Sequence, residues 1–401
     1  MRILSKELKK LFKPNLVIIL LLFSAVYMLL FCNAWKFPNN WGNSQYDVPM
    51  YHELVKQFGS TVDEDELPEL MQLKKNFIKE LITYIKDDSI FAQAGIDSYE
   101  KFDEVYRKNF DELSETEQTA QEEAWRFWFD KEETSELLFR IQCIDVILYC
   151  EKEGYLFSDI KKANAFLEKN HGGASNIYKL RMTKIYTELP YSLLPIAAED
   201  VLYSDQKVLI ILAVIWCFVL ILPFQITEQL RGVINITACT KTGKKIFCIQ
   251  AAASVIGGVV SCILITAAYT LLLKYKGILF FMDCPISTTS VPKWFDLTAM
   301  QYYILQCCVL IIVTVSASVL AYLIGRVSSS YIMGLAIAIP TAAVLCAASA
   351  YSSYKMFSVK EFENILFISA FGRLLVGIVF VAVIIMMAIA VKLFRDRKSD
   401  I

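Results

Sequence analysis

The chain has 401 residues, of which 56% are hydrophobic, and its mean hydropathy is +0.44. Soluble domains are usually about 45–50% apolar, so this composition excludes a soluble enzyme, a nucleic-acid binder and a disordered protein. The formal net charge of −1 hides an asymmetry, because residues 34–206 hold 19 Lys and Arg against 33 Asp and Glu, a net of −14. The rest of the chain has a net charge of +13, so an acidic polar block and a basic apolar block share one chain.

The first residues, 1–14, alternate lysines with apolar residues near helical spacing. Pro14 ends this pattern, and we predict a cytoplasmic amphipathic elbow that lies on the inner face of the bilayer. The alternative is an ordinary basic flank of the first span. The uncharged run 15–33 is longer than the apolar core of a signal peptide, and no small-residue cleavage site follows it. We therefore expect it to remain as transmembrane helix 1.

Residues 34–206 are expected to form a folded helical domain rather than a linker. Apolar residues recur every three or four positions over 70–85, as on one face of a helix. Ser114 and Glu117 form a capping box, which predicts one long helix from there to about Cys150. Strand-like alternation is absent, and about 170 residues of this composition can bury a core.

The second half of the chain, 207–401, contains further uncharged runs long enough to cross the hydrocarbon core as helices. They lie at 208–226, 247–273, 300–324, 331–350 and 370–391. Together with the first run, they predict an all-α polytopic membrane protein with six transmembrane helices. The large α-helical extracellular domain then lies between helices 1 and 2.

The orientation follows from the short segments, where Lys and Arg are in excess. The N-terminal arm, the loop 227–246 and the C-terminal tail are all basic, and an even number of spans places them on one side. The positive-inside rule assigns that side to the cytoplasm. We expect a multi-pass protein of the cell membrane with both termini cytoplasmic. Only Cys143 and Cys150 occur in the external segment, which argues against a disulfide scaffold and favours a bacterial cell.

The sequence contains no recognisable catalytic or metal-binding motif. It has two histidines, His52 and His171, and neither the H-E-x-x-H zinc motif nor the G-x-S-x-G nucleophile elbow. Gly243-Lys244 resembles the end of a phosphate-binding loop, but Ala238 and Lys245 break the required pattern. We therefore expect no catalytic residue, no metal site and no cofactor bound by this chain. The substrate-binding residues are not identifiable.

The loop after the second span is the most informative segment. An acid and a glycine open it, a threonine follows, and a glycine with two lysines leads into the third span: Glu228, Arg231, Gly232, Thr240, Gly243, Lys244 and Lys245. In this spacing, in the basic elbow, in the six spans and in the large external domain, the chain resembles the ABC-2 family of exporter permeases. In that family an acid, a glycine about four residues later, a threonine and a Gly-Arg or Gly-Lys pair form a coupling helix that docks on a separate ATPase. Gln250 departs from the pattern, since many members carry a lysine there.

The resemblance implies a transport subunit that is not itself an enzyme. ATP and Mg are expected in a partner ATPase, which the seven loop residues would contact. Glu228 and the basic residues of the loop would pair with opposite charges on that partner. Six spans form half of such a translocator, so a second permease chain, identical or homologous, is also expected, within the lipid bilayer and without nucleic acid. The plainer alternative is a basic loop in which Gly232 merely ends a helix.

A second hypothesis is a membrane sensor or receptor whose external domain binds a ligand. The charge of −14 and the nearby Trp125 and Trp128 favour a cationic or amphipathic peptide as that ligand. Such a peptide is also a possible substrate of an exporter, or one against which it confers resistance. A sensor needs an output module, and the cytoplasmic parts are short, which favours the exporter.

Overall fold

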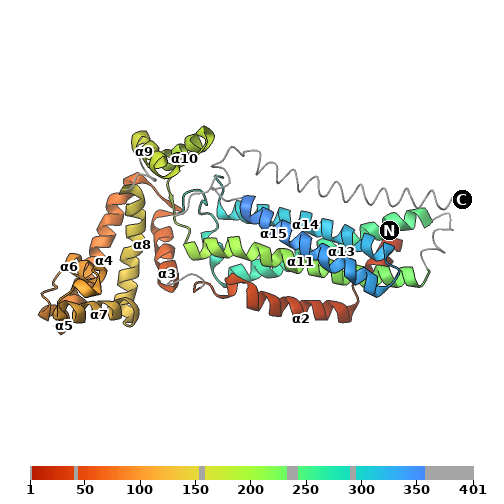
Figure 1. Cartoon of the computed structure of the whole chain (residues 1–401), viewed down its shortest axis with the longest axis horizontal. Helices are drawn as coiled ribbons and strands as arrows, with labels where there is room; N and C mark the ends of the chain where they lie inside the picture. The colour runs from red at the N-terminus through yellow and green to blue at the C-terminus, as the bar shows by residue number, and fades with distance from the viewer. Residues whose placement is uncertain (1, 40–43, 153–158, 233–242, 290–294, 357–401) are drawn as a thin grey trace. The chain divides into compact units, whose positions relative to one another are not determined.

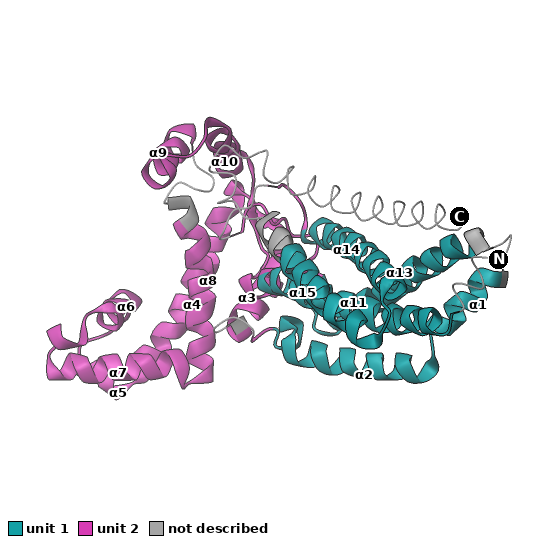
Figure 2. Cartoon of the chain, turned by 45° about the vertical axis from the view of Figure 1, so that its right-hand side comes forward, with its two compact units in different colours: residues 1–37, 200–279, 299–401 teal, residues 38–199, 280–298 magenta. Residues whose placement is uncertain are grey.

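The computed structural model describes residues 2–39, 44–152, 159–232, 243–289 and 295–356. The chain forms two compact units, shown in Figure 2. Unit 1 comprises 1–37, 200–279 and 299–401, and unit 2 comprises 38–199 and 280–298. The sequence placed the boundaries of the acidic domain at 34 and 206. In the structure, the corresponding part of unit 2 runs from residue 38 to residue 199, and unit 2 also includes 280–298.

Unit 1 is a helical bundle in which the long helices run side by side (Figure 1). Its described elements are α1 (Arg2–Leu11), α2 (Pro14–Phe31), η1 (Asn33–Trp35), α11 (Ile196–Leu230), α13 (Gly243–Tyr275), α14 (Ala299–Val327) and α15 (Tyr331–Met356). Within the described residues, five of these helices, α2, α11, α13, α14 and α15, are long and apolar enough to cross a membrane. This is consistent with a multi-pass membrane protein.

Each of the first five expected spans coincides with one of these helices, and the expected span 370–391 lies outside the described residues. The ends differ most for α11, which begins at Ile196, well before the expected start at residue 208. The difference arises because a hydropathy rule ends a span at the first charge. The backbone of α11 continues as a helix through Glu199, Asp205 and Lys207.

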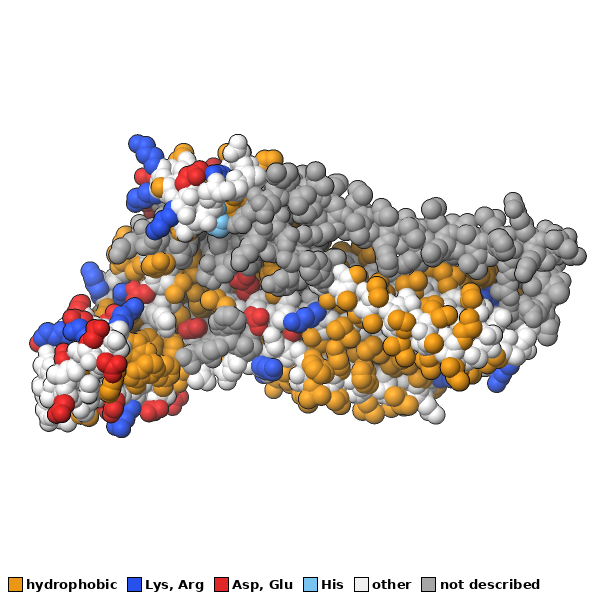
Figure 3. Space-filling model, in the orientation of Figure 1, with side chains coloured by type: hydrophobic (Ala, Val, Ile, Leu, Met, Phe, Trp, Pro, Cys, Tyr) orange, Lys and Arg blue, Asp and Glu red, His pale blue; other side chains and the backbone are white. Residues whose placement is uncertain are grey.

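Helix α11 is the centre of unit 1. Of its most apolar stretch 72% is buried, against 17% for α2 and for α15. Close packing around α11 uses small residues: a Cβ added to Gly258 of α13 would lie 2.0 Å from the Ser318 Oγ of α14 and 3.3 Å from the Cys217 Sγ of α11. On the face seen in Figure 3 the side chains of unit 1 are mainly apolar, as expected for a surface that meets lipid.

Unit 2 is mainly helical, as the sequence predicted. Its elements are α3 (Ser44–Phe58), β1 (Thr61–Val62), η2 (Glu64–Glu66), α4 (Leu67–Asp87), α5 (Ser89–Gln93), α6 (Tyr99–Arg107), η3 (Phe110–Glu112), α7 (Glu115–Phe129), α8 (Glu132–Lys152), α9 (Ile160–His171), α10 (Asn176–Glu188) and β2 (Tyr191–Ser192), and the 3-10 helix η4 (Ile278–Phe281) leads from unit 1 into the loop 280–298. The two strands pair antiparallel, Thr61 with Ser192 and Val62 with Tyr191.

The core of unit 2 gathers between α4, α5, α6, α7 and α8. Three buried phenylalanines meet at its centre, where the ring of Phe91 lies edge-on to Phe102 at 5.5 Å and to Phe127 at 5.0 Å between centroids. Such edge-to-face pairs add to the burial of apolar area. This aromatic centre fixes α5, which is too short to be stable alone, against the longer helices.

The prediction of a single helix from the capping box to Cys150 is wrong. Helix α7 ends at Phe129, and α8 begins at Glu132. The hydroxyl groups of Thr134 and Ser135 donate hydrogen bonds to the Phe127 carbonyl at 2.8 and 3.1 Å. These bonds satisfy a carbonyl at the end of α7 and hold the chain in a turn. Tertiary packing of α8 against α7 therefore overrides the continuous helical pattern.

The capping box itself is confirmed. The Ser114 hydroxyl accepts the Glu117 backbone N–H at 3.4 Å, and the Glu117 carboxylate accepts the Ser114 backbone N–H at 2.9 Å. The pair satisfies two donors at the start of α7. These bonds lower the pKa of Glu117, since both the hydroxyl and the backbone N–H of Ser114 donate to its ionised form.

Candidate functional site

The structure places the first residues of the expected coupling segment at the end of a long helix. Glu228 lies in the last turn of α11. Gly232 follows with a φ of +66°, a left-handed conformation that glycine adopts without strain. Its backbone N–H donates to the Gln229 carbonyl at 3.1 Å, so Gly232 terminates α11. Helix α11 ends at Leu230 and α13 begins at Gly243, and residues 233–242 of the expected loop 227–246 lie outside the described part of the chain.

The rest of the segment is described only in part. Thr240 lies outside the described residues. Gly243, Lys244 and Lys245 form the first turn of α13, and their side chains are outside the described part. Arg231 is exposed immediately after α11. The structure therefore brings the two ends of the segment onto the ends of two adjacent spans.

Four polar side chains meet at this end of the bundle, and we call them the loop-end network: Glu7, Lys10, Glu228 and Gln250. The Lys10 Nζ donates to the Glu7 Oε1 at 2.7 Å and to the Glu228 Oε1 at 3.1 Å. The Gln250 Nε2 donates to the Glu228 Oε2 at 2.6 Å and to the Glu7 Oε2 at 3.4 Å. The network thus joins α1 to the last turn of α11 and the first turns of α13.

Burial makes these contacts strong. Glu7 and Glu228 are only 6% and 7% exposed, so each carboxylate depends on its donors within the protein. Burial alone would lower the pKa of Lys10, but the hydrogen bonds to Glu7 and Glu228 and their negative charges raise it instead. Lys10 therefore stays protonated between the two carboxylates. Its Nζ also lies 5.5 Å from the ring centre of Phe224, which favours the cation further.

The expected pairing of Glu228 with a partner protein stays a prediction. The two carboxylate oxygens of Glu228 are already used within the chain, by Lys10 and Gln250. The sequence analysis missed Lys10 of α1 as a partner of Glu228, because the two residues are 218 positions apart. A basic residue in an amphipathic arm is equally consistent with a contact to lipid. The one signal was Gln250, the position where the sequence departs from the family pattern.

Several buried amide atoms in and beside the network have no hydrogen-bond partner within the described part of the chain. They are both side-chain atoms of Gln225 and the Oε1 atoms of Gln229 and Gln250. Gln225 packs against Gly325 of α14. A Cβ added to Gly325 would lie 2.5 Å from the Cβ of Gln225. Buried polar atoms without protein partners are the usual sites of ordered water. This end of the bundle is therefore polar although the helices that form it are spans.

The opposite end of the bundle holds a buried acid that the sequence analysis did not single out. The Asp205 carboxylate of α11 accepts the backbone N–H groups of Asn33 at 2.6 Å and Ala34 at 3.0 Å, and the Tyr269 hydroxyl at 3.0 Å. Three donors compensate the buried charge and hold the end of α2 against α11 and α13. Asp205 was missed because it precedes the expected start of span two. Its contacts fit a structural role.

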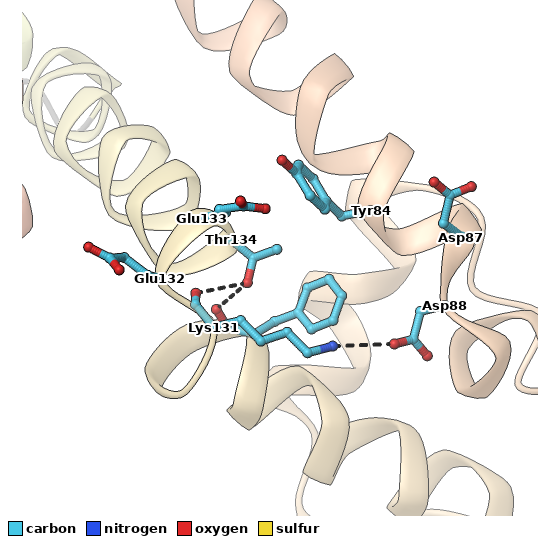
Figure 4. A pocket seen from close by; sticks show the side chains of 8 residues that line it. Tyr84, Asp87, Asp88, Lys131, Glu132, Glu133 and Thr134 are labelled. Carbon is cyan, nitrogen blue, oxygen red and sulfur yellow. Dashed lines mark hydrogen bonds and ion pairs between the residues drawn. The ribbon is translucent and has the colours of Figure 1, made fainter.

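Unit 2 contains an open pocket of about 460 Å³ between the end of α4 and the start of α8, shown in Figure 4. Acidic side chains dominate its wall: Asp87, Asp88, Glu132 and Glu133, with Tyr84, Phe127, Lys131 and Thr134. Lys131 donates to Asp88 at 3.4 Å and to the buried Glu123 at 2.6 Å. The negative charge of Glu133 and its hydrogen bond raise the pKa of Tyr84. In the described ranges no group of three or more His, Cys, Asp or Glu could hold a metal ion.

Comparison with known proteins gives no match. No protein family, no curated protein and no solved structure resembles the chain closely enough to be matched. Any assignment of function therefore rests on the spacing of the loop, on the helices that could span a membrane and on the geometry of the loop-end network.

Proposed function

We propose that this chain is the permease subunit of an ATP-driven exporter of the ABC-2 type, and that the segment 228–245 docks a separate ATPase. The observation that carries the proposal is the loop-end network. A segment that transmits force from a soluble protein must be joined rigidly to the spans it moves. The network ties both ends of this segment to each other and to α1.

The network and the loop have different roles in this proposal. Glu228 is a positioning residue, because its carboxylate holds α1 and α13 to the end of α11. Arg231, Lys244 and Lys245 supply the contacts to acidic groups on the ATPase. Gly232 allows the chain to turn directly out of α11.

The remaining parts follow from the same proposal. ATP and Mg bind to the ATPase, and this chain contributes no catalytic residue. A second permease chain, identical or homologous, completes the translocation path. The termini and the segment 228–245 face the cytoplasm of a bacterial cell, and unit 2 faces outwards. The sixth span expected at 370–391, which lies outside the described residues, completes the topology.

Affinity purification of the tagged chain from its native host tests the docking. An ATP-binding cassette ATPase is expected to co-purify with the wild type. The variant Arg231→Ala/Lys244→Ala/Lys245→Ala should retain about a tenth of that ATPase or less, since several charged contacts of about 0.5–1 kcal/mol each are lost. The matched control is Lys207→Ala/Lys274→Ala, which removes two exposed basic residues far from the docking segment, one within α11 and one in the last turn of α13. Equal recovery of the ATPase with both variants would contradict the proposal.

A receptor is the second candidate, and the open acidic pocket of unit 2 favours it. The same purification separates the two functions. Recovery of a kinase or response regulator in place of an ATPase would support the receptor and exclude the exporter.

A further inference from the structure

Unit 2 carries a continuous set of aromatic rings that runs from its interior to its surface. The centroid of Tyr106 lies 5.2 Å from Trp125 and 5.4 Å from Trp128, and Trp125 stacks on Phe129 at 5.4 Å. Trp128 continues inwards to the buried Phe139 at 5.1 Å. We call Tyr106, Trp125, Trp128 and Phe129 the aromatic face. Its rings come from α6 and α7, and Phe139 of α8 lies behind them.

The outer rings of this face are open to solvent. Trp125 is 50% exposed and Phe129 is 48% exposed, and they lie four residues apart on the same side of α7. Figure 3 shows apolar side chains gathered on unit 2 near the junction of α7 and α8, among charged neighbours. The buried Trp128 Nε1 has no acceptor in the described part of the chain. Single exposed apolar residues are ordinary, but a contiguous apolar patch marks an interaction site.

The charge around the aromatic face is negative. The nearby basic residues Arg107 and Arg126 are each paired with an acid of their own helix, Asp103 at 2.8 Å and Glu123 at 3.2 Å. The exposed acids Glu122 of α7 and Asp130, which follows α7, have no ion pair within the described residues. Residues 34–206 carry a net charge of −14. The face therefore attracts cations at low and moderate ionic strength.

The rings also have unused capacity for cations. Unit 2 places Lys131 over Phe127 at 4.1 Å and Arg140 over Phe77 at 5.4 Å. No Lys or Arg of the described residues lies over Tyr106, Trp125 or Phe129. Aromatic faces attract ammonium and guanidinium groups, and Trp125 offers the strongest such site on this surface.

We propose that the aromatic face binds a cationic amphipathic peptide. Lys or Arg side chains of the peptide lie over Trp125 and Phe129 and near Glu122 and Asp130, and its apolar side chains pack on the exposed rings. The charge complementarity selects this occupant. An anionic lipid surface and a second copy of unit 2 both bring further negative charge to an acidic face. The proposal concerns unit 2 and is independent of the docking segment in unit 1.

The experiment uses the full chain in nanodiscs of zwitterionic phosphatidylcholine. The probe is a fluorescent 18-residue helical peptide of leucine and lysine, and fluorescence anisotropy gives its Kd. We expect the Kd to rise about tenfold or more between low and high salt, because screening removes the attraction. Trp125→Ala/Phe129→Ala should weaken binding about tenfold, since two cation–π contacts are lost. Trp125→Phe keeps a ring and should retain most of the affinity.

The matched control is Ile177→Ala/Leu180→Ala, which removes two exposed apolar side chains of α10, 61% and 76% exposed. It should bind the peptide like the wild type, and thermal unfolding checks that each variant is folded.

Unchanged affinity of folded Trp125→Ala/Phe129→Ala would overturn the proposal. Equal binding of a peptide with glutamate in place of lysine would also overturn it. So would equal binding of the probe to empty nanodiscs, or a loss of affinity in the control variant alone. Sedimentation that showed the wild type to associate through this face, with no peptide binding, would instead assign the face to a second copy. Recovery of the ATPase is expected to be the same in all these variants, so this test and the docking test fail separately.

Discussion

A single glutamine decides the charge balance of the loop-end network. Gln250 neutralises neither Glu7 nor Glu228, so the network holds two carboxylates and one lysine. Gln250→Lys adds a second cation to the network. We expect it to preserve or raise the melting temperature of the detergent-solubilised chain.

Gln250→Leu is the matched variant with the opposite outcome. It removes the donor to both buried carboxylates and should cost about 1–3 kcal/mol, the usual effect of losing a hydrogen bond to a charged group. Thermal unfolding monitored by tryptophan fluorescence, to which the buried Trp216 contributes, measures both variants. A leucine variant as stable as the wild type would show that the network does not hold α13 to α11.

Asp47 of α3 makes unit 2 sensitive to pH. Burial raises the pKa of Asp47 above its ordinary value of 3.8, although a hydrogen bond from the Cys143 thiol at 3.3 Å opposes the shift. A raised pKa means that the folded state prefers the protonated acid. The stability that this proton contributes is present below pH 3.8 and is lost as the pH rises through the raised pKa.

We therefore expect Asp47→Asn to be more stable than the wild type at neutral pH and to lose that advantage as the pH falls towards 4. Asparagine is neutral throughout and still accepts from the Cys143 thiol. Melting temperatures across a pH series measure the difference, and the exposed Asp111→Asn serves as the control. An advantage of Asp47→Asn that grows towards acid would contradict the assignment.

At the scale of the helix, adjacent glycines of α13 make different contacts. A Cβ at Gly258 would lie 2.0 Å from the Ser318 Oγ, whereas a Cβ at Gly257 would lie 3.3 Å from the end of the Leu11 side chain in α1. Gly258→Ala should therefore cost about 1–3 kcal/mol from overpacking. Gly257→Ala should cost less, because the Leu11 side chain can move.

Removal of the obstructing hydroxyl tests the cause. Ser318→Ala leaves only a Cβ, 3.3 Å from the added methyl group, so it should restore much of the stability lost in Gly258→Ala. Thermal unfolding of the two single variants and the double variant gives the coupling between the sites. Additive effects would mean that Gly258 is not a close helix contact.

The spans were predictable from sequence because the hydrocarbon core excludes charge, and the uncharged runs that became α2, α13, α14 and α15 ended within a few residues of the expected places. The start of α11 was not predictable from sequence, because a helix can continue beyond the edge of the membrane. The break between α7 and α8 was not predictable either. Residues 129–132 contain no glycine or proline, and the turn there depends on Thr134 and Ser135 reaching back to a carbonyl of α7.

The candidate site also has features that the sequence predicts and features that depend on the fold. The acid, the glycine and the basic pair of the loop were visible as a spacing, and local backbone chemistry explains Gly232. The partners of Glu228 depend on the fold, because Lys10 and Gln250 reach it from other helices. The aromatic face shows the same limit: the sequence analysis singled out Trp125 and Trp128 beside the acidic residues but could not predict that Trp125 is half exposed.

At the scale of the whole molecule, unit 2 should fold without the spans, and its second segment should stabilise the first. The backbone N–H of Ser192 donates to the Thr288 carbonyl at 3.1 Å, and the ring of His52 lies 4.0 Å from Phe280. We expect 38–199 joined by a linker to 280–298 to give a helical circular dichroism spectrum and a cooperative melt. The segment 38–199 alone should melt at a lower temperature. A spectrum dominated by β-structure would contradict the fold, and equal melting temperatures would show that 280–298 does not stabilise unit 2.

The central claim is that an ATPase docks where α11 ends, and photo-crosslinking in living cells of the native host tests it most directly. A benzoylphenylalanine replaces Arg231, which is exposed beside Gly232, and in a parallel strain it replaces Lys274 at the opposite end of α13. Irradiation is expected to link position 231, and not position 274, to an ATP-binding cassette ATPase that mass spectrometry identifies. A link from position 231 to a kinase or response regulator, or the same ATPase captured equally from both positions, would contradict the central claim.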